Sequence, residues 1–129
     1  MGIRQFEEIE GWKEARVLAA KVYDISNHGR FSTDFGLRDQ IRRASVSIMA
    51  NIAEGFGRGG KTEFLRFLRI SRASALETQS HLYIALDLGY LSTEDFETLH
   101  KQAIRVTHLV GGFINYLSHH EEPNNRITD

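Results

Sequence analysis

The sequence TEDFETLHKQAIRVTHLVGGFINYLSH, residues 93–119, contains the clearest helix pattern of the chain and decides its fold. Its apolar positions recur at alternating three- and four-residue steps: Phe96, Leu99, Ala103, Val106, Val110, Phe113 and Leu117. This spacing follows the 3.6-residue turn of the α-helix and places the side chains on one stripe. A helix with so regular a stripe is typical of a bundle, where the stripe packs against neighbouring helices.

The residues before this helix predict how it begins. Ser92 is a suitable N-cap, Asp95 three residues later is the acidic partner of a capping box, and Leu91 and Phe96 can form a hydrophobic staple. Gly89 can adopt the left-handed conformation that ends a preceding helix. The sequence therefore predicts a tight turn between two helices.

Three further helices are predicted upstream, over residues 11–27, 35–54 and 61–88. Gly29 and Gly55 are the expected stops of the first two. Their apolar stripes comprise Trp12, Ala15, Leu18, Ala19, Val22 and Ile25; Leu37, Ile41, Ala44, Ile48 and Ile52; and Phe64, Leu68, Ala75, Leu82 and Leu86. Because no alternating strand pattern occurs, we expect an all-α four-helix bundle over residues 1–120, followed by a flexible polar tail over 121–129.

Length and composition restrict the class of protein. The 129 residues suit one domain and include no cysteine, which excludes disulfides and thiolate metal sites. Pro123, the single proline, follows all the predicted helices. The N-terminus has no apolar signal region and no run is long enough to span a membrane, so we expect a cytoplasmic protein without membrane contact.

The second half of the 35–54 helix is apolar on nearly all sides. Val46, Met49, Ala50 and Ala53 project away from the stripe that contains Leu37. A four-helix bundle covers only one side of each helix, so these four residues are candidates for contact with another subunit.

Positive charge is concentrated in one part of the sequence. Residues 30–72 contain nine Arg or Lys and four acids, a net charge of +5, whereas the whole chain has a net charge of −1. Such an imbalance indicates an anionic partner, and Arg and Lys bind nucleic-acid phosphates without a fixed motif. A solvated face with local salt bridges explains the same charges equally well. The candidates for nucleic-acid binding are Arg38, Arg42, Arg43, Arg58, Lys61, Arg66, Arg69 and Arg72.

Residues 55–62, GFGRGGKT, match the phosphate-binding pattern G-x-x-x-x-G-K-[ST]. That motif works when a buried strand presents the loop and a second strand supplies an acid for Mg²⁺. Here a predicted helix precedes the motif and no strand is expected. We therefore interpret these residues as a basic connection between helices, with a nucleotide-hydrolysing enzyme dependent on Lys61 as a third hypothesis.

Neither a metal site nor a catalytic group emerges from the other residues. Glu97 and His100 have the spacing used in di-iron bundles, but such a site needs a second copy of the motif and two more glutamates. We expect no cofactor, no metal and no enzymatic activity. Asn51 projects close to the core stripe, where its amide needs hydrogen-bond partners, for which a neighbouring helix end or loop is the expected source.

Several segments together resemble a known family. They are residues 6–15, with Phe6, Glu7, Ile9, Trp12 and Ala15; residues 36–55, GLRDQIRRASVSIMANIAEG; Gly57-Arg58 with residues 63–68, EFLRFL; and residues 85–91, with Ala85, Leu88, Gly89, Tyr90 and Leu91. This pattern is similar to the four-helix bundle proteins encoded in 23S ribosomal RNA intervening sequences. The accessory variability determinants of diversity-generating retroelements belong to the same group. The resemblance covers about residues 6–117.

The resemblance implies an antiparallel up-down bundle that assembles into a homopentameric barrel without known catalytic activity. For the retroelement relatives it also implies nucleic-acid binding and contact with a reverse transcriptase. Met49 stands where the family often has proline, so a kink there is expected to be weaker or absent.

The leading hypothesis is therefore a homo-oligomeric module that binds RNA or DNA through its basic surface. The alternative is a structural or adaptor protein whose oligomer binds a protein, such as a reverse transcriptase, without binding nucleic acid itself.

Overall fold

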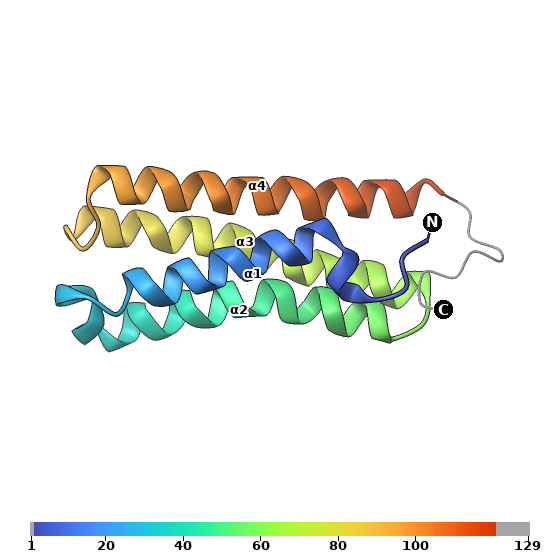
Figure 1. Ribbon diagram of the computed structural model, residues 1–129, viewed down its shortest axis with the longest axis horizontal. Helices are drawn as coiled ribbons and strands as arrows, with labels where there is room; N and C mark the ends of the chain where they lie inside the picture. Colours follow the sequence, from blue (N-terminus) through green and yellow to red (C-terminus); the bar gives the residue numbers. More distant parts are fainter. Residues whose placement is uncertain (1, 121–129) are drawn as a thin grey trace.

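The computed structural model describes residues 2–120 and contains the four predicted helices (Figure 1). They are α1 (Glu10–Ile25), α2 (Phe35–Gly57), α3 (Lys61–Asp87) and α4 (Thr93–Ser118). Two short 3₁₀ helices, η1 (Phe6–Glu8) and η2 (Gly29–Thr33), precede α1 and α2. Within residues 2–120 there is no strand, which confirms the all-α class. The predicted polar tail lies outside the described residues.

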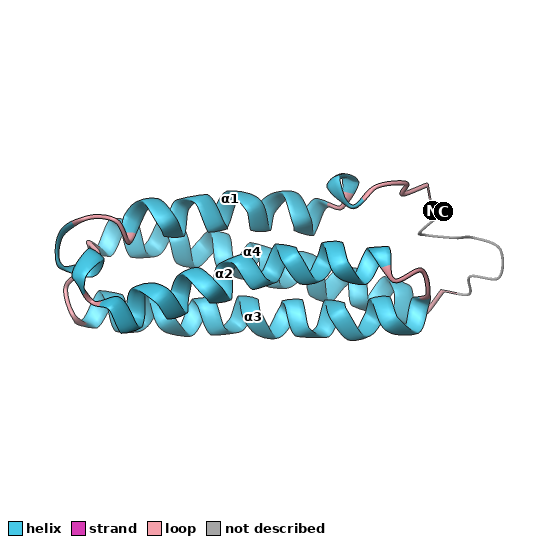
Figure 2. Cartoon of the chain, turned by 90° about the horizontal axis from the view of Figure 1, so that it is seen from below, coloured by secondary structure: helices cyan, strands magenta, loops and turns pink. Residues whose placement is uncertain are grey.

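The helices run alternately up and down, and the termini of the described chain lie at the same end of the bundle as the α2–α3 turn (Figures 1 and 2). Helix α1 packs against α2 and α4, and helix α3 packs against the same two. Consequently α2 and α4 occupy diagonal positions and their outer surfaces point in different directions. The described part of the chain has no helix that is long and apolar enough to cross a membrane.

The stripe of α4 forms the core as predicted. Its members are buried except Phe113, which is half-buried and packs against the core. Phe64 contacts Phe113 edge to face, with ring centroids 5.5 Å apart. The predicted stripe of α2 is also buried along its whole length.

The turn between α3 and α4 has the predicted local structure. Gly89 has a φ of 73°, and the N–H groups of Gly89 and Tyr90 donate to the carbonyls of Leu86 and Ala85. These two bonds form a Schellman motif, which satisfies the last carbonyls of α3. Ser92 then accepts a hydrogen bond from the backbone N–H of Asp95 at 3.0 Å. Helix α4 therefore begins at the predicted cap.

The predicted end of α2 at residue 54 is wrong, because the helix continues to Gly57. Gly55 lies inside the helix, on the side that packs against α3. A Cβ at this position would lie 2.5 Å from the Cβ of Phe67. Gly55 is thus a packing glycine, and the chain leaves the helix conformation later, with Gly59 at a φ of 89°.

The predicted end of α1 also differs, because this helix ends at Ile25 before residue 27. Gly29 has a φ of 56° and begins η2. Asp34 caps α2 by accepting from the N–H of Leu37, and its second carboxylate oxygen accepts from the hydroxyl of Tyr90 at 2.9 Å. This last bond ties the α1–α2 connection to the α3–α4 turn.

Candidate functional site

The candidate cations on the first half of α2 face its junction with α1. Arg38 donates to Asp39 and to the carbonyl of Ser32, both at 3.0 Å. Arg42 donates to the Ser26 hydroxyl at 2.8 Å and lies over the ring of Tyr23, 4.6 Å from its centroid. These contacts give both arginines a role in holding α1, η2 and α2 together.

Three more candidates surround the α2–α3 turn. Arg58 pairs with Glu54 at 2.9 Å, and Arg66 pairs with both carboxylate oxygens of Glu63 at 3.2 and 3.3 Å. The hydrogen bond from Arg66 lowers the pKa of Glu63 below its usual value. Lys61 donates to the carbonyl of His120 at 2.7 Å. Arg58 and Arg66 also lie over the ring of Phe67, at 4.9 and 4.6 Å.

Arg43, Arg69 and Arg72 are exposed, and none of them pairs with a carboxylate within residues 2–120. Arg43 lies on α2 beside Val46 and Ala50. Arg72 crosses onto α4, because its Nε lies 3.4 Å from the position that a Cβ on Gly111 would occupy. These three arginines are the candidates whose charge is most accessible to an external anion.

The eight candidates do not form one cluster, although they come from one block of the sequence, residues 30–72. Arg38 and Arg58 are separated by about 30 Å along α2, at 1.5 Å per residue. Since α3 runs antiparallel to α2, Arg66 lies at the turn end and Arg72 near the middle of the bundle. The structure therefore divides the candidates among both ends of the bundle and its middle.

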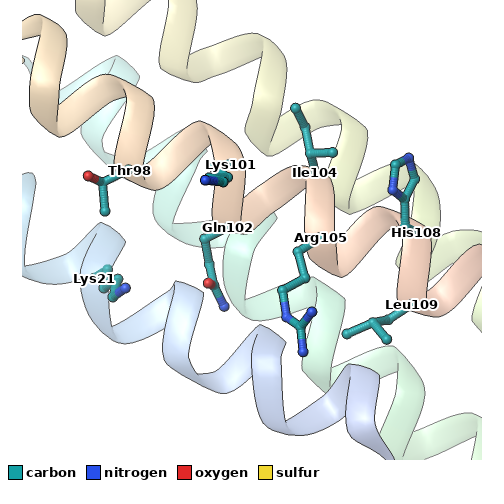
Figure 3. A pocket seen from close by; sticks show the side chains of 8 residues that line it. All are labelled: Lys21, Thr98, Lys101, Gln102, Ile104, Arg105, His108 and Leu109. Carbon is teal, nitrogen blue, oxygen red and sulfur yellow. The ribbon is translucent and has the colours of Figure 1, made fainter.

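A second group of cations, which the sequence block did not include, lies on α1 and α4. Lys21, Lys101 and Arg105 line a surface depression of about 670 Å³, together with Gln102, His108 and other α4 residues (Figure 3). A sequence signal for this group exists, because the chain contains no Asp or Glu from Thr98 to His120. The net charge of a sequence segment does not reveal this group, since Lys21 and Arg72 lie beside α4 but come from distant parts of the sequence.

Glu14 connects α1 to α4 through two residues that line this depression, Gln102 and Arg105. Its carboxylate accepts from the amide of Gln102 at 2.8 Å and lies 3.4 Å from Nε of Arg105. The hydrogen bond from Gln102, aided by the charge of Arg105, lowers the pKa of Glu14. Gln102 also donates to the backbone carbonyl of Glu14.

The candidate subunit contacts lie on the outer side of α2. Val46 is 39% exposed, Ala50 is exposed, and Met49 and Ala53 are half-buried. Val46 and Ala50 border a depression of about 560 Å³ that also includes Tyr23 and Arg43. Helix α2 is continuous through Met49. A second protein surface could cover this face without disturbing the core.

The phosphate-binding sequence match does not have the geometry of a nucleotide site. Gly55 to Gly57 belong to α2, and only residues 58–60 separate this helix from α3. The residues that precede the motif are helical, so no strand presents a loop to phosphates. The chain segment is a short turn between antiparallel helices.

The two other polar residues considered in the sequence, His100 and Asn51, contact side chains or backbone of the bundle itself. His100 stacks on Phe96 with centroids 4.9 Å apart and contacts Tyr83 edge to face. No group of three or more potential metal ligands occurs among residues 2–120. The amide of Asn51 donates to the carbonyl and the hydroxyl of Ser47 in its own helix, which corrects the expectation of a partner from a neighbouring helix or loop.

These features define a four-helix bundle with cations dispersed over its surface and an apolar outer face on α2. Residues 7–112 match the family described as 23S rRNA-intervening sequence protein, and the chain belongs to this family. A search of curated proteins found no match.

A solved structure has the same fold. It is a protein of unknown function from the S23 ribosomal protein family of Bacteroides thetaiotaomicron, with 22% sequence identity and a TM-score of 0.74. The match covers 81% of this chain and 97% of that chain. At this identity the likeness shows the fold alone.

Proposed function

We propose that this protein is a non-enzymatic, homo-oligomeric module that associates with RNA or DNA through surface cations. The observation that carries the proposal is a set of exposed arginines, Arg43, Arg69 and Arg72, that have no carboxylate partner within residues 2–120. Such cations neutralise phosphates and release counterions, which provides affinity without base recognition. Membership of a family named for an rRNA intervening sequence is consistent with a nucleic-acid partner.

Assembly supports this function, because a ring repeats every surface cation once per subunit. Several weak contacts on one strand then act at a high effective concentration. The outer side of α2, with Val46 and Ala50, is the proposed subunit contact, and a homopentamer is the proposed state. Membership of the retroelement-associated branch would add a reverse transcriptase as a partner.

The same structure offers an argument for an adaptor protein that does not bind nucleic acid. Arg38, Arg58 and Arg66 pair with Asp39, Glu54 and Glu63, and Arg42 and Lys61 donate to uncharged oxygens of the chain. Five of the eight candidate cations thus have internal roles. In that case the oligomer would present its surface to a protein such as a reverse transcriptase.

A fluorescence anisotropy titration with labelled RNA and DNA, repeated at several salt concentrations, tests the proposal. We expect log K to fall linearly with log[salt], with a slope of about −0.9 per phosphate neutralised on duplex DNA. Charge reversal at Arg69 and Arg72, two of the arginines without a carboxylate partner within residues 2–120, should make the slope shallower. Absence of binding by the wild-type protein at low salt would exclude the proposed function and leave the adaptor.

Calorimetry with Mg-ATP and Mg-GTP tests the nucleotide-hydrolysing alternative separately. We expect no heat of binding, because the residues before Gly55 form a helix and present no phosphate loop. Binding that disappears in Lys61→Ala would contradict the non-enzymatic proposal.

A further inference from the structure

The outer surface of α4 is free of carboxylates from Thr98 to its end and is bordered by cations from three helices. Lys101 and Arg105 belong to α4, Lys21 to α1, and Arg72 to α3. We call these four cations and the outer side of α4 between them the α4 face. Neither the depression beside Lys101 nor a second one of about 470 Å³ beside Arg72 has an Asp or Glu in its lining, whereas a depression on the other side of Lys21 includes Asp24 and Asp95.

Two glycines shape the second depression. Gly111 and Gly112 lie inside α4, where each glycine costs about 1 kcal/mol of helix stability relative to alanine. The side chain of Arg72 occupies the space over Gly111, whereas a Cβ on Gly112 would meet no atom within 4 Å. Internal packing therefore does not explain Gly112. Its missing side chain leaves the helix surface open to close approach from outside.

We propose that the α4 face is the surface that contacts the phosphate backbone of nucleic acid. Lys101 and Arg105 are about 6 Å apart along the helix axis, and Arg72 reaches α4 about 9 Å further on, at Gly111. A row of cations at such intervals matches the repeated charge of a phosphodiester chain better than a single small anion. Glu14 lies 3.4 Å from Nε of Arg105 and neutralises part of its charge, so Arg105 attracts a phosphate less strongly than an unpaired cation does.

The position of this face fits the proposed assembly. Helices α2 and α4 are diagonal in the bundle, so Val46 and Ala50 lie on a different side of the subunit from the α4 face. This inference rests on the proposed nucleic-acid function and assigns it to cations largely outside the sequence block 30–72. Of that block only Arg72 belongs to the α4 face.

Salt-dependent anisotropy with the full chain tests the assignment. The variant Lys101→Gln/Arg72→Gln should make the slope of log K against log[salt] shallower by about 1.8 on duplex DNA, since about 0.9 is lost per phosphate contact. The control Arg4→Gln/Lys13→Gln removes the same charge from exposed positions at the N-terminal end and should retain the wild-type slope.

A second variant tests the shape of the surface without changing its charge. Gly112→Gln should bind more weakly at every salt concentration with an unchanged slope, because its side chain fills the open position. Loss of folding would not explain this result, since replacing a helix glycine raises helix stability. A circular dichroism melt confirms that the variant is folded.

The outcomes separate the inference from the proposed function. If the wild-type protein binds and both α4 variants bind as it does, the α4 face is excluded and other cations carry the function. If the wild-type protein binds neither RNA nor DNA, the proposed function fails and the inference fails with it. Binding of polyglutamate, but of no nucleic acid, would overturn the assignment in favour of an acidic polypeptide.

Discussion

Gly55 shows how one residue sets the distance between two helices. Its neighbours across the interface are Phe67 and Phe64, and a Cβ would lie 2.5 and 3.1 Å from their atoms. The nearer atom is the Cβ of Phe67, which can move only if the backbone of α3 moves. The packing of Phe64 and Phe67 against α2 therefore depends on the absence of a side chain at Gly55.

Gly55→Ala should destabilise the protein by about 1–3 kcal/mol, the usual range for overpacking a core. Chemical denaturation with urea measures this difference. Gly112→Ala is the matched control: it also replaces a helix glycine, but its Cβ meets nothing within 4 Å, so it should stabilise by about 0.5–1 kcal/mol. An unchanged or higher stability of Gly55→Ala would show that α2 and α3 separate easily.

The carboxylate of Glu14, on α1, contacts Gln102 and Arg105 on α4 and so contributes to the packing of these two helices. Its pKa is lowered in the folded protein by the hydrogen bond from Gln102 and by the charge of Arg105. A lowered pKa means that the ionised form stabilises the fold. This stabilisation is present above the ordinary pKa of 4.5 and is lost as the pH falls through the lowered value.

The free energy of unfolding of Glu14→Gln should therefore be lower than that of the wild type at pH 7, by up to about 1 kcal/mol. The difference in free energy of unfolding between the two proteins should disappear as the pH falls below the lowered pKa, because both then carry a neutral group at this position. Denaturation curves at a series of pH values measure it. A gap that is constant with pH would show that the charge of Glu14 contributes nothing.

At the scale of elements, the sequence was most informative where helix periodicity and capping agreed. The stripe from Phe96 to Leu117 and the Ser92 cap were both predicted, because they depend on residues close in sequence. The end of α2 was not, since a glycine that stops a helix and a glycine that packs against Phe67 look alike in sequence. The two short 3₁₀ helices have too few residues for a periodic pattern.

The candidate site was less predictable, because the sequence does not show which side chains pair or pack with one another. Whether Arg58 or Arg66 is free depends on a glutamate one turn away, and whether Arg72 joins Lys101 depends on how α3 packs on α4. The acid-free stretch from Thr98 to His120 was a usable signal in the sequence. The sequence alone does not show that cations of α1, α3 and α4 border the surface that this stretch forms.

At the scale of the whole molecule, apolar side chains are exposed on the outer side of α2 and also on α3, where Leu76, Tyr83 and Ile84 are about half exposed. Val46 is 39% exposed and is followed one turn later by Ala50, so the centre of α2 offers apolar and small side chains to a partner. A ring that closes through this face must pair it with a different surface of the next subunit, because cyclic assemblies larger than dimers use heterologous contacts. Each subunit would then contribute one α2 face.

Val46→Asp/Ala50→Asp should therefore convert the oligomer to a folded monomer. Light scattering should give a mass five times that of the 14.7 kDa chain for the wild type and one chain mass for the variant. Val17→Asp is the comparison variant, since Val17 is 43% exposed on α1: an intact oligomer would place α1 outside the contact, and a monomer would identify α1 as the surface that pairs with α2. A wild-type protein that is monomeric at micromolar concentration would contradict the assembly. If the variant remained an oligomer with an unchanged circular dichroism spectrum, the subunits would have to meet through a surface other than α2.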